Sequence, residues 1–239
     1  MAVIGGRAHI NGITFATNTH VVRGKLKNGE LTVYVQRLPE YAIIKAMDKI
    51  PFVRGISKLA KINLKLFLMI VIILATPWDW IFPSGQVETS SIDWYVLGIY
   101  ILVLIAAVFL LKRLWQYHGA EHKAFNIYTS GNEFLLESVI RADRVSDRCG
   151  TNLVVILLPI MFLLSFVLGN FPLLLYLLSI SVGYEIFNWS SRKQRLRIVF
   201  AIAAIIQKYI VTAEPTEEQI QLAIATIRKA IETEKQALM

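Results

Sequence analysis

Long apolar runs alternate with charged segments along this chain. Trp94–Leu111 and Asn152–Leu168 contain no charged residue, Phe171–Trp189 contains only Glu185, and Ile62–Phe82 has a dense apolar centre. Each run approaches the ~20 residues that a helix needs to cross a bilayer. The pattern therefore predicts an α-helical membrane protein with four transmembrane helices, of which the last two form a hairpin.

Composition supports the membrane interpretation. Hydrophobic residues make up 55% of the 239 residues and charged residues only 18%, which is below the roughly 25% of ordinary soluble domains. This excludes disorder, a coiled coil and an ordinary soluble enzyme. The single cysteine, Cys149, excludes a disulfide scaffold and a Cys-rich zinc ribbon. No signal peptide is expected, because residues 1–10 lack a basic segment followed by an apolar one.

The basic residues are distributed unevenly between the predicted spans. Residues 1–61 hold ten Lys and Arg, residues 83–93 none, residues 112–151 six, and the tail after Trp189 eight. Cytoplasmic loops carry an excess of Lys and Arg, so both termini are predicted to be cytoplasmic. This topology accounts for the net charge of +8, and the expected partner is the lipid bilayer rather than nucleic acid.

The polar segments before and after the membrane region in the sequence are both predicted to form cytoplasmic structure. In 1–61, His20–Leu26 and Glu30–Leu38 alternate apolar and polar residues around Asn28-Gly29, and Asn11-Gly12 is a second Asn-Gly turn signal. A small antiparallel sheet is expected, followed by a short basic helix over 41–59. The predicted domains are then residues 1–61, the membrane region 62–189 and a cytoplasmic tail 190–239.

The tail combines an apolar patch with an amphipathic helix. Ile198–Ile206 is too short to span and is interpreted as an interfacial helix or an extension of the preceding helix. Thr216–Gln219 fits a capping box. The isoleucines that follow share one helical face, which is expected to pack on the chain's own cytoplasmic domain rather than on a partner: Ile220, Ile224, Ile227 and Ile231.

The sharpest chemical signal is His118-Gly-Ala-Glu121-His122, an H-x-x-E-H pattern. Histidines four residues apart on a helix point the same way and can reach one metal ion, and Glu121 could act as a base or as a ligand. If the second span continues as a helix, His118 lies roughly 10 Å beyond the hydrocarbon edge, at the cytoplasmic face. The alternative is a solvated helical turn, and the metal interpretation is favoured.

Two further residues are predicted to reach the same side of the membrane. Cys149 precedes the third span, where a helix start would lower its thiol pKa, and a His, His, Cys set suits zinc. Glu185 lies near the cytoplasmic end of the fourth span, where a carboxylate is costly unless it is paired or coordinated. The alternatives are a packing role for Cys149 and a salt bridge from Glu185 to Arg148 or Arg192. A tight glycine turn at residues 5–9 could add His9.

These residues resemble the YqhQ-like family of bacterial membrane proteins, which are labelled as metal-dependent enzymes. The resemblance covers nearly the whole chain. It rests on these motifs: Gly5-Gly6-x-Ala8 with Gly12, Pro51-Phe52-x-Arg54-Gly55, Gln116–Lys123 with Tyr128 and Gly131, Arg148–Thr151, Tyr184-Glu185, and Glu214-Pro215 with Glu218–Ile220. It implies a multi-span protein of the bacterial cell membrane with a cytoplasmic metal site.

The chain departs from the family pattern at two places. Asn11 stands where the family has an acidic residue, and Ser146-Asp147 stands where it has His-Pro. If those family residues are ligands, His9 and Asp147 are the candidate substitutes.

The leading hypothesis is a metal-dependent membrane enzyme, hydrolytic in type, acting on a substrate that the sequence does not name. His118, His122 and Cys149 would bind a divalent metal, zinc by ligand type. Glu121 would be the general base, or Glu185 if Glu121 is a ligand. The alternative is a non-catalytic scaffold or assembly factor with a structural or lost metal site. A transporter ranks last, because few polar groups interrupt the spans.

Overall fold

The chain divides into two compact units, each assembled from separate segments. The computed structural model describes residues 3–27, 29–38, 46–62, 64–76, 94–168, 171–193, 195–237 and 239. The first unit, here called the sheet unit, combines Met1–Pro39, Gly98–Thr151 and Phe200–Met239. The second, the hairpin unit, combines Glu40–Leu97 and Asn152–Val199. Both units therefore draw on segments that lie far apart in the sequence.

The sheet unit contains the antiparallel sheet that the sequence predicts. Strands β1 (Val3–His9), β2 (Gly12–Thr17), β3 (His20–Lys27) and β4 (Glu30–Arg37) lie in the order β1-β2-β3-β4. Gly29 has a φ of +82°, a value that glycine adopts freely and that tight hairpin turns require. The predicted glycine turn at residues 5–9 is wrong, because Gly5 and Gly6 lie within β1.

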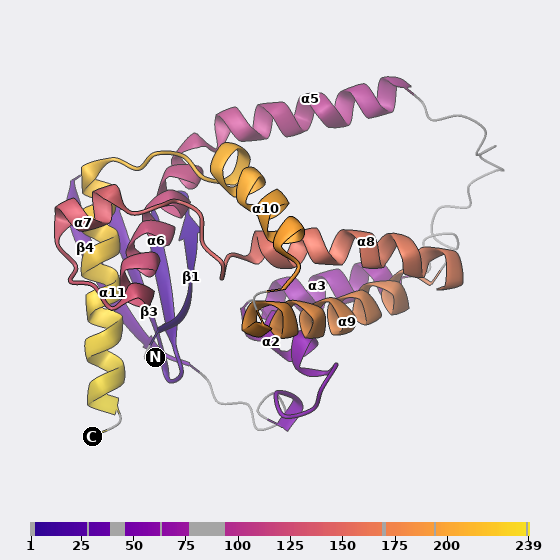
Figure 1. The fold of residues 1–239 in the computed structure, drawn as a ribbon, viewed down its shortest axis with the longest axis horizontal. Coiled ribbons are helices and arrows are strands. Elements are labelled where there is room, and N and C mark those ends of the chain that lie inside the picture. The colour runs from indigo at the N-terminus through magenta and orange to yellow at the C-terminus, as the bar shows by residue number, and fades with distance from the viewer. Residues whose placement is uncertain are drawn as a thin grey trace. The chain divides into compact units, whose positions relative to one another are not determined.

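One face of the sheet is covered by helices α6 (Lys112–Ser130) and α11 (Glu217–Ala237), as Figure 1 shows. The capping box of α11 is confirmed, since the Thr216 amide donates to Gln219 Oε1 and the Gln219 amide donates to Thr216 Oγ1. The prediction that its apolar face packs on the chain itself is also confirmed. Its residues Ile220, Ile224 and Ile227 are buried in the same core as Ile13, Phe15 and Val22 of the sheet.

The hairpin unit is built on α2 (Arg54–Ile62), α3 (Leu64–Ala75), most of α8 (Gly150–Leu168) and α9 (Pro172–Lys193). A Cβ on Gly183 would lie 2.5 Å from Leu157 Cδ2, so this glycine permits close packing of α9 on α8. The predicted basic helix over 41–59 differs in extent, since α2 begins at Arg54. Residues 39–45 lie outside the described residues.

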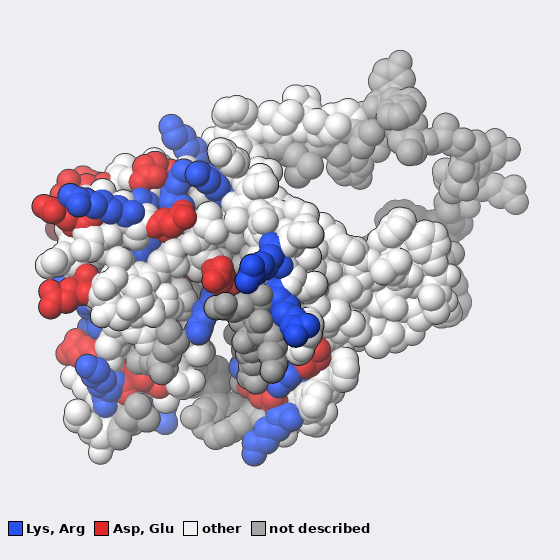
Figure 2. All heavy atoms as spheres, in the orientation of Figure 1, with Lys and Arg blue, Asp and Glu red and all other residues white. Residues whose placement is uncertain are grey.

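Within the described residues, two helices are long and apolar enough to cross a membrane, namely Gly150–Leu168 and Pro172–Ser190. A third candidate is the pair Ile101–Leu110 and Lys112–Ser130, which meets at a bend of 66°. The other two predicted spans correspond to α3, which has 12 residues, and to α5 (Trp94–Leu110), which has 17. Residues 77–93, between these two helices, lie outside the described part of the chain. These helices indicate membrane association, and Figure 2 shows a long uncharged surface on α8.

Helix α10 (Arg197–Ile206) is a separate helix rather than an extension of α9. Leu196, just before it, has a φ of 58°, which a continuous helix does not allow. Helix α10 leaves Ile198, Ile202 and Ile205 exposed on one face. It continues into a π-helical turn, η1 (Gln207–Val211).

Candidate metal centre

The H-x-x-E-H segment lies in the buried middle of α6. The residues from Gly119 to Phe125 are all buried, because this part of α6 packs between the sheet, α11 and the loop after α7 (Leu136–Arg141). The side chains of Glu121 and His122 are buried with it, and that of His118 is partly buried. Buried polar groups need partners, so the arrangement of His118, Glu121 and His122 is restricted by whatever surrounds them.

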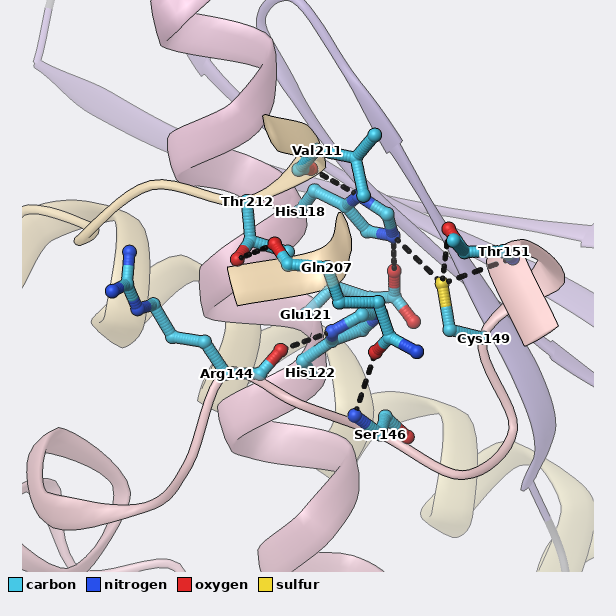
Figure 3. Close-up of polar contacts among 10 residues, drawn as sticks. All are labelled: His118, Glu121, His122, Arg144, Ser146, Cys149, Thr151, Gln207, Val211 and Thr212. Atoms are coloured by element: carbon cyan, nitrogen blue, oxygen red, sulfur yellow. Dashed lines mark hydrogen bonds and ion pairs between the residues drawn. The ribbon is translucent and has the colours of Figure 1, made fainter. Parts of the chain in front are cut away.

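Three potential ligand atoms converge at this place. The ligand atoms of His118, His122 and Cys149 all lie within 4.8 Å of one another, and His118 Nε2 is 3.7 Å from Cys149 Sγ. The two histidines come from α6 and the cysteine from the residue before α8 (Figure 3). The structure thus brings together all three residues that the sequence predicts as ligands.

Backbone carbonyls orient both imidazoles. His118 Nδ1 lies 2.7 Å from the Val211 carbonyl oxygen, and His122 Nδ1 bonds the Arg144 carbonyl oxygen. A carbonyl oxygen only accepts, so Nδ1 carries the proton in each ring and the lone pair lies on Nε2. Histidines that bind metals commonly donate their other ring nitrogen in this way.

Burial also keeps these two histidines neutral. It is the main cause that lowers the pKa of His118, and it lowers the pKa of His122 to about 3, with a further contribution from His118. Both rings are therefore uncharged at pH 7, the form in which histidine binds a metal.

The segments that supply the carbonyls are held by side chains of α6 and η1. Asn126 Nδ2 donates to the carbonyls of Asp143 and Val145, on either side of Arg144. Gln207 Oε1 accepts the Ser146 amide at 2.9 Å, which ties this loop to the π-helical turn. The turn ends at Val211, whose carbonyl orients His118. Single-turn π-helices occur frequently at functional sites.

Glu121 lies beside this group of three residues and outside the set whose ligand atoms all lie within 4.8 Å of one another. Its Oε2 is 3.7 Å from His118 Nε2, and the residue is 6% exposed. Burial raises its pKa to about 8, so the carboxyl is largely protonated at pH 7 in the absence of a nearby cation. Strand β1 passes so close that a Cβ on Gly6 would lie 2.6 Å from Glu121 Oε1. Gly6 therefore makes room for this carboxyl group.

The pKa of the Cys149 thiol is shifted in the direction opposite to the one expected from the sequence. Burial raises the pKa of its thiol, although the Thr151 hydroxyl and amide, 3.3 and 3.4 Å from Sγ, act in the opposite direction. The prediction of a lowered pKa at a helix start is wrong for the chain alone, since desolvation outweighs the helix end. A coordinated metal ion would remove the thiol proton.

Glu185 has a structural partner within the hairpin unit. Both of its carboxylate oxygens accept hydrogen bonds from Arg54, and Oε1 also accepts the Phe52 amide at 3.0 Å. This is an ion pair, as the alternative interpretation held, and its partner is Arg54. The Arg192 side chain, one of the two expected partners, lies outside the described part of the chain. Bidentate pairing of this kind satisfies this partly buried carboxylate without a metal.

The candidate substitute ligands lie elsewhere. His9 Nε2 is 2.8 Å from Thr14 Oγ1 on the sheet face that α6 does not cover, and Asp147 is exposed. Asn11 lies in the turn between β1 and β2, where its carbonyl accepts the Leu26 amide. Ser146 is buried beside the candidate site, and its backbone amide donates to Gln207 Oε1.

Sequence reasoning missed the groups that orient the three ligands. The carbonyls of Arg144 and Val211 carry no signal, because every residue has a carbonyl. Gly6 was noted as part of a glycine motif, but its role as the space for Glu121 depends on the packing of β1 against α6. A glycine in a strand can mark close approach of another group, and this was the available signal.

Replacing Gly6 by Ala is expected to displace the Glu121 carboxyl group. If that group supports a bound metal, zinc affinity should fall about tenfold, the lower range for changes in groups that surround ligands. Chelator competition measures the affinity. The matched control is Gly5→Ala, since a Cβ on Gly5 meets nothing within 4 Å. Equal affinities for the two variants would show that the Glu121 carboxyl group does not support a bound metal.

The fold and the site together define a class: a mainly helical protein with an N-terminal sheet, two candidate membrane-spanning helices and a buried His-His-Cys cluster. The chain belongs to the family described as "Protein of unknown function (DUF1385)", whose model matches residues 62–233. It is also similar to "Uncharacterized protein YqhQ" of Bacillus subtilis (strain 168), at 22% identity over 161 residues. These findings confirm the predicted YqhQ-like family.

The similarity to YqhQ covers 63% of this chain and 51% of that relative, so it spans about half of the relative's length. No solved structure matches the chain. The family description and the relative's name assign no activity, and any function must be argued from the site.

Proposed function

We propose that this protein is a zinc-dependent membrane enzyme of hydrolytic type, with its site at the cytoplasmic face of the membrane. One observation carries the proposal. The ligand atoms of His118, His122 and Cys149 converge within 4.8 Å, and both histidines are oriented by carbonyls that place the lone pair of each ring on Nε2. Two imidazoles and one thiolate are a donor set that suits zinc.

Each residue has a distinct role in this proposal. His118, His122 and Cys149 would hold a zinc ion, which would supply a Lewis acid to the site when bound. The carbonyls of Val211 and Arg144 fix the imidazoles, and Thr151 supports the Cys149 sulfur. Glu121, next to His118 Nε2, accepts the proton of the attacking water, because a neighbouring cation favours its carboxylate form. Glu185, already paired with Arg54, is left as a structural residue.

The proposed topology has four spans, with both termini in the cytoplasm of a bacterial cell. The two apolar helices α8 and α9 support two of the spans, and α5 and the segment that includes α3 would provide the others. The absence of Lys and Arg from residues 83–93 supports the orientation. In this topology α6 follows α5 on the cytoplasmic side, and the exposed isoleucines of α10 lie at the lipid interface.

A second candidate function is a membrane scaffold with a structural zinc ion. It is favoured by the burial of the cluster, since Glu121, His122 and Cys149 are 6%, 1% and 7% exposed. In that case Glu121 would complete a closed set of four protein ligands. Structural zinc sites are closed in this way, whereas catalytic sites keep an open position.

X-ray absorption on the zinc-loaded full-length protein in detergent distinguishes the two. We expect one sulfur, two imidazoles and one exchangeable oxygen ligand in both wild type and Glu121→Gln. With a panel of ester and phosphoester substrates, Glu121→Gln should lower the hydrolysis rate by about 10²–10⁴-fold. A spectrum that changes in Glu121→Gln would indicate that Glu121 is a ligand and favour the scaffold. Failure to bind zinc at all would overturn both.

A further inference from the structure

The sheet face opposite α6 and α11 carries a row of polar side chains that crosses all four strands. Arg7 pairs with Thr14, Thr14 with Arg23, and Arg23 with Tyr34 in the strand register. Side chains alternate between the two faces of a strand, so the neighbours Gly6, Phe15 and Val22 face the core while this row faces outward.

A hollow of about 350 Å³ lies over this row. The next row on one side contributes His9 and Lys25, and the next row on the other side contributes Val21 and Gln36. Binding pockets for small molecules begin at roughly 300 Å³, so the hollow is large enough for one. It is lined entirely by residues of the sheet.

The cations of the hollow have no acidic counterpart. Arg7 and Arg23 lie two strands apart, about 10 Å at the spacing of a sheet, and Lys25 follows Arg23 by about 7 Å along β3. Within the described part of the chain, none of the three forms an ion pair with a carboxylate. Like charges this close on one sheet face are unfavourable unless an anion compensates them.

The central arginine also has an unsatisfied donor. Arg23 Nε is buried and has no hydrogen-bond partner among the described residues. A buried donor without a partner carries a desolvation cost. Beside it, Lys25 Nζ lies 5.3 Å from the centre of the Tyr34 ring, so a positive charge and an aromatic face border the same space.

The positive charges around the hollow also affect the pKa of His9, which lies at its edge. Burial is the main cause that lowers the pKa of His9 to about 4, followed by the charges of Arg23, Arg7 and Lys25. His9 is therefore neutral at pH 7 and bonds to Thr14. The described residues that line the hollow thus offer cationic and neutral donors, and none of them is acidic.

We propose that this hollow binds the phosphate group of a small soluble phosphorylated molecule. Arginine presents a planar fork of donors that matches phosphate oxygens, and Arg7 and Arg23, which flank Thr14 in the row, both line the hollow. Tyr34 provides an aromatic face for the remainder of the ligand. The buried position of Arg23 Nε and the concave shape favour a compact ligand over a flat membrane surface. The proposal does not depend on the metal centre, which lies on the other side of the sheet.

Titration with inorganic phosphate at constant ionic strength tests the proposal on the full-length protein in neutral detergent. NMR follows the Arg23 Nε–Hε signal and the Thr14 backbone amide. We expect saturable shifts of both signals, and an affinity about tenfold lower in Arg7→Gln, since a hydrogen bond to a charged group is lost. The matched control is Lys27→Gln on β3, which removes a charge on the same strand outside the hollow.

A second measurement separates a soluble ligand from a lipid. The protein is placed in nanodiscs of neutral lipid, with or without phosphatidylglycerol, in phosphate-free buffer. The proposal expects the Arg23 and Thr14 signals to be the same in both. A shift caused by phosphatidylglycerol alone would assign the hollow to a lipid headgroup and overturn it. Shifts with phosphate that do not saturate, or that Arg7→Gln and Lys27→Gln weaken equally, would overturn it as well.

Discussion

Replacing His122 by Ala is expected to reduce the zinc content of the purified protein from about one ion per chain to near zero. The ligand atoms of His118, His122 and Cys149 lie within 4.8 Å, and removal of one leaves two donors, too few to hold zinc against the buffer. His118→Ala should have the same effect. Elemental analysis of detergent-purified protein after zinc loading and dialysis measures it.

The control for this experiment is His20→Ala. His20 lies on β3, where its Nδ1 bonds to Thr19, and it is outside the cluster. Full zinc content is expected in this variant. If the His122→Ala protein kept its zinc while remaining folded by circular dichroism, the metal centre as described would be incorrect.

Gly119→Ala is expected to destabilise the protein by about 1–3 kcal/mol, the usual cost of overpacking a core. A Cβ on Gly119 would lie 2.3 Å from the Ala213 carbonyl oxygen, and a backbone atom cannot move aside as the end of a side chain can. The Ala213 amide also bonds to the Trp115 carbonyl, so the two segments are held together. Thermal unfolding of the metal-free protein measures the loss.

The same substitution should also weaken zinc binding, because Ala213 is two residues from Val211, whose carbonyl orients His118. The control is Gly98→Ala on α5, where a Cβ meets nothing within 4 Å and helix propensity favours alanine. Similar melting temperatures for the two variants would show that the segment around Ala213 is not packed on α6 as described.

Local patterns predicted the elements whose residues interact with near neighbours in the chain. The hairpin β3–β4 followed from alternating residues around Asn28-Gly29, and α11 followed from a capping box and isoleucines at helical spacing. The same reasoning failed at Gly5-Gly6, which was interpreted as a turn. Glycine permits a turn but also permits close packing, and only the position of Glu121 shows that packing is its use here.

In the candidate site, too, local patterns predicted some residues correctly, while others depend on tertiary packing. His118 and His122 could be paired from the sequence because helical geometry places residues four apart on one face. Cys149 was added from the expected topology, and the structure places it within reach. Glu185 was added by the same reasoning, yet its partner is Arg54, more than a hundred residues away. Such a pairing depends on how α2 packs against α9, which no local pattern encodes.

By itself the sequence determined the family, through motifs that resemble those of its members. It also determined the mainly helical character, the apolar runs, the sheet hairpins and the two histidines, since these depend on composition or on short-range periodicity. Only the tertiary structure decided which tautomer each histidine adopts, that burial raises the pKa values of Glu121 and Cys149, and that three cations share an outward hollow of the sheet. The physical reason is that hydrogen-bond partners, desolvation and electrostatic fields arise from groups that are distant in sequence and close in space.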